Sequence, residues 1–293
     1  MHQKGLNGVQ TAIEPFVTSR QTALKFSVFS SLREHHSMRF ATLALGLTTL
    51  SSCFFVATVL GEPIPVRYGQ GSSHGFLALK TLDGVTIATG ESTQVVKRGI
   101  VTSRLTFRFK DGSLDDDVTV FTQQGVFRLI SDHHIQHGPS FPKPIDFLIE
   151  MASGDLTFKA EDGTISKEHM DLPADVSNGL PPNLLLNILP TTPETKVAYI
   201  APGKKARLIH LSIKPMGTLA FRVGAFRRKA TDFTLHVELG GVTGVVAPII
   251  GKQPSDYHIW LQDGTPPAFV REEGPLYEGG PIWRMEQISP SFQ

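Results

Sequence analysis

The feature that most constrains this chain is an alternation of apolar and polar residues that recurs through most of its length. Within residues 101–109, Val101, Leu105 and Phe109 fall on one face of an extended strand, whereas Arg108 falls on the other. A spacing of two is typical of an antiparallel strand that has one face in a core and the other in water. Asp-Gly and other Gly-containing turns separate these runs, as in β-hairpins. The sequence therefore predicts an all-β, mainly antiparallel fold.

The same pattern predicts strands along the whole second part of the chain. So many short strands leave little room for an alternating α/β arrangement. They are expected at residues 76–81, 85–94, 101–110, 118–123, 126–135, 145–151, 156–160, 165–169, 197–201, 207–213, 218–223, 229–239, 257–262, 268–272 and 282–288.

One stretch, residues 171–190, breaks the alternation and is rich in leucine and proline. Pro181 and Pro182 suit a helix start, where a missing backbone N–H costs nothing. Pro190 then ends the helix. We therefore expect a short helix over residues 182–189. Because this helix is apolar on nearly all sides, it must be covered, and we expect it to plug an open curved sheet or half-barrel.

Residues 40–60 form an uncharged apolar run long enough to cross a hydrocarbon core of about 30 Å as a helix. Basic residues outnumber acidic ones ahead of this run, which predicts a cytoplasmic N-terminus and export of the rest. If translation begins at Met38, the run is a secretory signal cleaved after Gly61, which is the interpretation we favour. An uncleaved membrane anchor is one alternative, and lipidation of Cys53 is another.

This interpretation divides the chain into three segments. Residues 1–37 are an N-terminal tail or a mis-assigned start, residues 38–61 are a signal peptide or membrane anchor, and residues 62–293 are a single exported β domain. The protein is then periplasmic or otherwise extracytoplasmic, with membrane contact through residues 40–60 if they remain uncleaved.

Cysteine usage and charge narrow the function classes. Cys53 is the single cysteine, so the exported part can hold no disulfide, zinc thiolate site or cysteine nucleophile. Five basic and two acidic residues of the 28 and 27 in the chain precede residue 62, which leaves 23 basic against 25 acidic residues. That balance gives no cationic footprint for a nucleic acid. We predict no cofactor.

Residues 71–75 match the G-x-S-x-G pattern of a nucleophile elbow, with Ser73 at its centre. An elbow places its serine on a tight turn between a buried strand and a helix. Here polar residues precede the motif and a strand is expected to follow it. A hydrolase site at Ser73 is therefore an alternative that we do not favour.

A histidine-rich strand resembles a metal cluster. Because adjacent side chains of a regular strand point to opposite faces, we expect His133 beside Phe127 on one face and His134 beside Asp132 and Arg128 on the other. Only Asp132 and His134 can then meet one ion, whereas a catalytic zinc site takes three protein ligands. We predict a hydrogen-bonded polar face, no metal site and no catalytic residue.

Two charge runs have plain interpretations. Asp115, Asp116 and Asp117 are expected in a solvated turn rather than as a pair of catalytic carboxylates. Residues 227–229 (Arg-Arg-Lys) are expected at an exposed strand start rather than in a binding patch.

The C-terminal half resembles exported bacterial β-proteins of unknown function. Residues 230–239 are followed by residues 257–261, which end in Trp and Leu, then by the Asp263-Gly264 turn and the proline-led strand at residues 266–271. Such proteins are similar to the lipoprotein-carrier architecture, in which a curved antiparallel sheet wraps a short helical plug. The resemblance implies a fold and a compartment more than an activity.

We therefore predict a non-enzymatic cell-envelope protein that binds a lipid or acyl moiety, or a protein partner, on the concave face of its sheet. An apolar, glycine-punctuated loop at residues 240–251 either folds back onto the core or forms a lip over this site, and the prediction uses the lip. The alternatives are an envelope hydrolase that uses Asp132 and His134 or the Ser73 loop, and a structural module that presents its edge strands. The candidate ligand-binding residues are Leu185, Ile188, Val245, Val246, Ile249 and Trp260.

Overall fold

The computed structural model describes residues 61, 63–223, 225–239 and 253–289. Contacts divide the chain into two units, Met1–Phe55 and Val56–Gln293, and every described residue belongs to the second. Among the described residues, no helix is long and apolar enough to cross a membrane. The expected signal or anchor at residues 40–60, with Met38 and Cys53, lies outside the described residues.

The second unit contains one antiparallel sheet of 14 strands, in the order β8-β7-β6-β5-β4-β3-β2-β1-β14-β13-β12-β11-β10-β9. Strands that follow one another in sequence are therefore mostly neighbours, and β1 and β14 join the two ends of the described chain. The strands are β1 Ser73–Lys80, β2 Thr86–Lys97, β3 Ile100–Phe109, β4 Leu114–Gln124, β5 Val126–His137, β6 Ile145–Glu150, β7 Asp155–Lys159, β8 Ile165–His169, β9 Thr195–Ala201, β10 Arg207–Val223, β11 Phe226–Glu238, β12 Tyr257–Gln262, β13 Ala268–Gly274 and β14 Trp283–Ile288.

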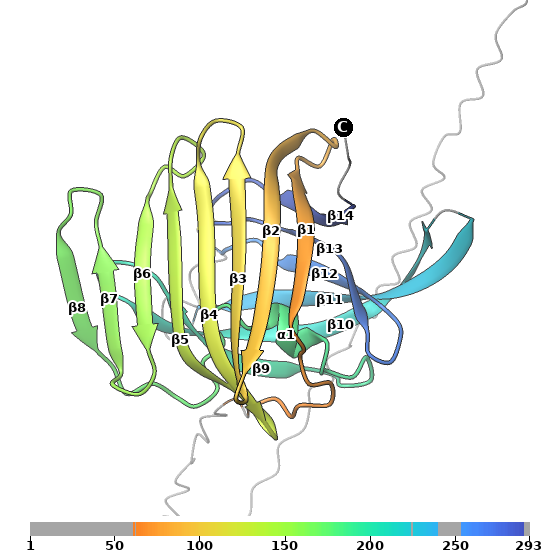
Figure 1. The fold of residues 1–293 in the computed structure, drawn as a ribbon, viewed down its shortest axis with the longest axis horizontal. Coiled ribbons are helices and arrows are strands. Elements are labelled where there is room, and N and C mark those ends of the chain that lie inside the picture. The colour runs from red at the N-terminus through yellow and green to blue at the C-terminus, as the bar shows by residue number, and fades with distance from the viewer. Residues whose placement is uncertain (1–60, 62, 224, 240–252, 290–293) are drawn as a thin grey trace, which may run out of the picture. The chain divides into compact units, whose positions relative to one another are not determined.

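The sheet bends around the helix α1 (Pro181–Leu185), so that β1–β8 lie on one side of it and β9–β14 cross behind (Figure 1). The main core joins Leu184 and Leu185 of the helix to Phe121 and Phe147 on one side and to Phe233 on the other. The expected open curved antiparallel sheet with one short plugging helix is confirmed.

The helix is shorter than the expected residues 182–189, for a specific reason. It starts at Pro181, as its two prolines predict, but ends at Leu185. The side-chain Nδ2 of Asn187 donates to the carbonyl of Asn183 at 2.8 Å. A longer helix would pair that carbonyl with the backbone N–H of the same Asn187. The chain instead continues through tight turns to Ile188.

The segment before the helix, residues 175–178, covers one edge of the sheet. Asn178 donates from Nδ2 to the carbonyl of Ile200 at 2.9 Å and accepts from the N–H of Ile200 at 2.8 Å. Asp175 and Ser177 bond the N–H and the carbonyl of Ala198 in the same way. Side chains and backbone of this segment thus take up hydrogen-bonding groups that β9 would otherwise leave open as an edge strand.

The other edge strand, β8, is protected differently. It is five residues long and carries Lys167, Glu168 and His169. Short, charged edge strands resist pairing with another chain. The two terminal strands of the sheet, β9 and β8, are therefore covered or charged, and this disfavours a module that presents either of them to a partner.

A β-bulge in β5 sets which residues face the core. Val120 of β4 pairs with Ser131, but the next residue, Phe121, pairs with Leu129. Ile130 is therefore an extra residue in β5. A bulge of one residue reverses the faces of every side chain that follows it in its strand.

We predict that Gly179→Ala lowers the free energy of unfolding by roughly 2–5 kcal/mol. Gly179 has a positive φ of 65°, and an added Cβ would overlap Oγ1 of the buried Thr119. The matched control is Gly163→Ala, because Gly163 has a φ of 82° but open space around it. Only the backbone cost of roughly 1–2 kcal/mol applies there. Urea denaturation measures both values, and equal losses would contradict the close approach.

Candidate functional site

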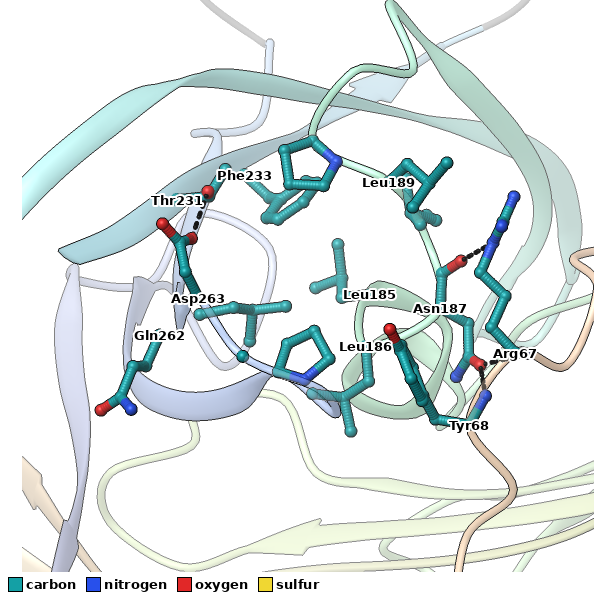
Figure 2. A pocket seen from close by; sticks show the side chains of 15 residues that line it. Arg67, Tyr68, Leu185, Leu186, Asn187, Leu189, Thr231, Phe233, Gln262 and Asp263 are labelled. Atoms are coloured by element: carbon teal, nitrogen blue, oxygen red, sulfur yellow. Dashed lines mark hydrogen bonds between the residues drawn. The ribbon is translucent and has the colours of Figure 1, made fainter.

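Helix α1 and the turns that follow it, residues 181–190, are named the plug. An open cavity of about 180 Å³ lies between the plug and the β11–β12 pair (Figure 2). Its walls are mostly apolar and come from segments far apart in the sequence. The segment before β1 contributes Arg67 and Tyr68, and the plug contributes Leu185, Leu186, Asn187, Ile188, Leu189 and Pro190. The strands contribute Thr231, Phe233, Leu261 and Gln262, and the loop after β12 contributes Asp263, Gly264 and Pro267.

The rim of the cavity carries one cation and one anion on opposite sides (Figure 2). Asn187 fixes the cationic side, because its Oδ1 accepts from the backbone N–H groups of Arg67 at 2.8 Å and Tyr68 at 2.7 Å. Nε of Arg67 in turn donates to the carbonyl of Asn187 at 3.0 Å. On the other side, Oδ1 of Asp263 accepts from the hydroxyl of Thr231 at 3.1 Å. The rim is therefore positioned by hydrogen bonds.

Of the candidate ligand-binding residues, the structure places Leu185 and Ile188 in this cavity. Val245, Val246 and Ile249 lie outside the described residues. The expected lip at residues 240–251 likewise lies outside the described residues. The cavity itself lies at the Leu261 end of β12.

Trp260 lies on the other face of the sheet, which the sequence did not indicate. Its neighbours Ile259 and Leu261 join the core, so Trp260 points away from the plug. The guanidinium of Arg271 covers its ring at 4.1 Å from the centroid, and His258 stacks beside it. Trp260 is buried by these outer side chains, and it does not share the cavity with Leu185.

A second cluster of functional groups lies on the inner face of β4 and β5, which we name the acidic ladder. It consists of three pairs of residues that lie opposite one another on the two strands and point to the same side. The pairs are Asp115 with Gln136, Asp117 with His134, and Thr119 with Asp132.

The expectation of a solvated turn at residues 115–117 is therefore wrong. Asp115 and Asp117 occupy inward positions in line with the core residue Phe121, which follows them by six and four residues. Asp116 points to the other face, where it accepts from Arg104 through both oxygens at 2.8 and 2.9 Å and from Thr106 at 2.5 Å. The alternation that ends at Phe121 was the sequence signal for the inward carboxyls.

The bulge at Ile130 also corrects the faces expected for the histidines. Asp132 and His134 do share a face, as expected, but that face is the inner one. His133, expected beside Phe127, points outward and bonds Asp146 at 2.9 Å. Alternation counted from Phe127 misses the extra residue, because nothing in the residue types marks it.

Hydrogen bonds join most of the ladder. His134 Nε2 lies 2.8 Å from Oδ1 of Asp115, to which Gln136 Nε2 also donates at 3.2 Å. The hydroxyl of Thr119 donates to Oδ1 of Asp132 at 3.0 Å. Oδ1 of Asp117 is buried and has no hydrogen-bond partner among the described residues. The carboxyl of Asp115 is thus paired to a histidine, whereas one oxygen of Asp117 has no hydrogen bond among these residues.

The protonation states follow from burial and from these neighbours. Burial raises the pKa of Asp132 well above its ordinary value, and the charge of Asp117 raises it further. Burial likewise raises the pKa of Asp117. Burial alone would lower the pKa of His134, but its bond to Asp115 and the surrounding carboxylates raise this pKa to about 9. At neutral pH the ladder therefore holds a protonated His134 bonded to Asp115, beside the carboxyls of Asp117 and Asp132, which bind protons more tightly than usual.

Neither set of residues considered for a hydrolase forms a reaction centre in the part of the chain that the structure describes. Ser73 lies exposed at the start of β1, where it pairs with Gln94 of β2 rather than with a base. Among the same residues, no three His, Cys, Asp or Glu side chains are arranged to hold a metal ion. Within the described part of the chain, the hydroxyl in the ladder is that of Thr119, which is buried and donates to Asp132.

No protein-family model matches the chain, and no curated protein matches it. Among solved structures, it is similar to a β-barrel-like protein of the domain of unknown function DUF1849 from Brucella abortus. The two chains share 10% sequence identity with a TM-score of 0.43, and the match covers 75% of this chain and 96% of that one.

We predict that stability falls as the pH rises from about 5 to about 9. Asp117, Asp132 and His134 all bind protons more tightly in the folded chain than in the unfolded one. The stability that His134 contributes is complete below its unfolded pKa of 6.5 and is lost as the pH passes about 9. Urea denaturation at a series of pH values measures this slope.

Variants of two neighbouring residues test whether this pH dependence of stability arises in the acidic ladder or on the outer face of the sheet. Asp117→Asn removes a negative charge, so the pKa values of both Asp132 and His134 fall and the slope becomes flatter. Asp116 is the matched control. Burial alone would raise the pKa of its carboxyl, but the hydrogen bonds from Arg104 and Thr106 hold this pKa below the ordinary value. Asp116→Asn should cost roughly 1–3 kcal/mol at every pH between 5 and 9 and leave the slope unchanged. Parallel curves for Asp117→Asn and the unmodified chain would refute the assignment.

Proposed function

We propose that this protein is a non-enzymatic binding protein of the cell envelope and that it binds the end of an acyl chain in the cavity beside its plug. The observation that carries the proposal is the cavity itself, with apolar walls from Leu185, Ile188 and Phe233 and a polar rim. Small-molecule sites typically combine an apolar interior with a few positioned polar groups.

The size of the cavity limits what it can take. The plug fills the concave face of the sheet, since Leu184 and Leu185 are fully buried in the core. What remains open is about 180 Å³. A cavity of roughly 150 Å³ accommodates benzene, so this one suits an apolar group of roughly seven carbon atoms. We therefore favour a short acyl chain, or the end of a longer one, over a whole diacyl lipid.

The charged and polar groups on the cavity rim favour a ligand whose acyl chain carries an anionic head group. Asp263 already accepts a hydrogen bond from Thr231. Arg67 is exposed and lines the cavity, and among the described residues its side chain donates a hydrogen bond only through Nε, to the carbonyl of Asn187. A guanidinium binds carboxylates and phosphates through two parallel hydrogen bonds. A fatty acid or an acyl phosphate would therefore place its charge at Arg67 and its chain against the plug.

Other functions have less support. A hydrolase needs a reachable nucleophile or metal beside a base, but the Thr119 hydroxyl of the acidic ladder is buried and the described residues hold no metal-binding group of three ligands. A module that recruits partners through its edges conflicts with the covered β9 and the short, charged β8. An apolar side chain of a partner protein would fit the cavity by size but would not use Arg67.

We predict that octanoate binds this cavity with a dissociation constant on the order of 1 mM. Leu189→Trp should weaken binding at least ten-fold, because Leu189 lines the cavity and a larger side chain there occupies it. Leu208→Trp is the matched control, since Leu189 and Leu208 are both 40% exposed but only Leu189 lines the cavity. Isothermal titration calorimetry measures both.

The head-group assignment has its own test. Octanoate should bind more tightly than octylamine, and Arg67→Gln should remove this preference, whereas Arg128→Gln on the exposed face of β5 should not. Equal binding of both amphiphiles to the unmodified chain would contradict a role for Arg67. If neither binds, or if both tryptophan variants bind as the unmodified chain does, the acyl proposal fails and a protein partner becomes the better candidate.

A further inference from the structure

The β10–β11 hairpin continues beyond the rest of the sheet as a two-stranded ribbon, which we name the arm (residues 216–229; cyan in Figure 1). Among the described residues, β9 pairs with β10 only as far as Ile213, and β12 pairs with β11 only from Ala230. The outer edges of the arm therefore have no partner strand in the described chain. A lone two-stranded ribbon has little stability in water by itself.

One face of the arm is apolar. Cross-strand pairing places Leu219, Phe221, Val223 and Phe226 on the same side, together with Arg228, whose guanidinium lies over the ring of Phe226 at 5.6 Å. Phe226 is 65% exposed and Val223 is 56% exposed. Large apolar side chains gathered on a projecting element mark a surface that binds something.

The opposite face of the arm is cationic. The pairs on that side place Arg222 opposite Arg227, and Ala220 opposite Lys229. Residues 216–229 contain these three cations and Arg228 and no acidic residue, in a chain whose overall formal charge is +1. The concentration of positive charge is therefore a local property of the arm.

We propose that the arm docks on an anionic lipid membrane, with its apolar face in the interface between head groups and acyl chains. The four cations match the negative charge of such a surface, and each basic residue near it contributes about 1 kcal/mol. The two strands lie about 5 Å apart, so long arginine and lysine side chains on the far face can reach around the ribbon to the head groups. An apolar face opposite a cationic one is the arrangement of amphipathic membrane-binding elements.

The test places a reporter in the arm of the full-length chain. Phe226→Trp keeps the side chain aromatic and apolar, whereas the native Trp260 and Trp283 are buried and respond little. With vesicles of phosphatidylglycerol and phosphatidylcholine, emission from the variant should shift to shorter wavelength and be quenched by brominated lipid. Phe76→Trp on β1 is the matched control, because Phe76 is also exposed and should show neither change. The reporter senses the arm whatever residues 1–60 do.

The charges are tested in the same background. Arg227→Gln with Lys229→Gln should weaken the apparent vesicle affinity on the order of 10- to 30-fold, whereas Arg128→Gln with Lys143→Gln, both exposed elsewhere, should leave it unchanged. Raising the salt from about 0.1 to about 0.5 M should weaken binding as well.

Three results would overturn the proposal: no blue shift at any vesicle concentration, equal quenching of the Phe226→Trp and Phe76→Trp variants, or the same affinity for neutral and anionic vesicles. A dimer that dissociates when Leu219 is changed to Ser, measured by light scattering without lipid, would also overturn it. That result would assign the arm to a second copy of the chain.

Discussion

The whole fold depends on how the open sheet pairs its edge strand and fills its concave face. A sheet of 14 strands that does not close into a barrel leaves unpaired backbone groups along its last strand and an apolar surface on its inner side. Residues 175–188 resolve both. Asn178, with both halves of its amide on Ile200, acts as a short substitute for a neighbouring strand, and ten residues later the same segment has filled the hollow with Leu184, Leu185 and Ile188.

The acidic ladder lies directly beneath that segment, which explains why its polarity is tolerated. Burying charge costs far more than a hydrogen bond returns unless the charges are paired or neutralised. His134 and Asp115 form a charge pair, and Asp132, whose pKa is raised by burial, accepts a hydrogen bond from Thr119. Gly179 rests against Thr119 and Asp132 without a side chain of its own. The ladder therefore forms a polar surface that packs so closely against residue 179 that only glycine fits there.

Much of this architecture could be predicted from residue patterns, and the exceptions have identifiable causes. Alternation assigned the faces of β3 and β11, and the two prolines gave the start of the helix. One inserted residue, Ile130, was invisible to the same method because the chain on either side alternates correctly. The inward carboxyls of β4 were hidden by their neighbours: three consecutive aspartates look like a turn, and the decisive signal was their spacing from Phe121.

The cavity required tertiary structure, because Arg67, the plug and the loop after β12 are remote from one another in sequence. So did the arm. Residues 227–229 alone were correctly interpreted as an exposed strand start. Only the pairing with residues 216–223 shows that apolar side chains collect on one side and cations on the other.

The cavity and the arm share a strand, which links the two proposals physically. Thr231 and Phe233 line the cavity from the inner face of β11, and Lys229 and Arg227 continue the same row of side chains into the arm. Successive side chains on one face of a strand are about 7 Å apart. Anionic head groups attracted to Lys229 would therefore gather within one or two residues of the cavity rim, on the same side of the strand. Arg67 lies on that rim. The cationic face of the arm therefore continues into the cavity wall along β11, while the apolar face that we assign to the membrane lies on the other side of the strand. Head groups held by the far-face side chains around the edge of the ribbon would thus lie next to the cavity.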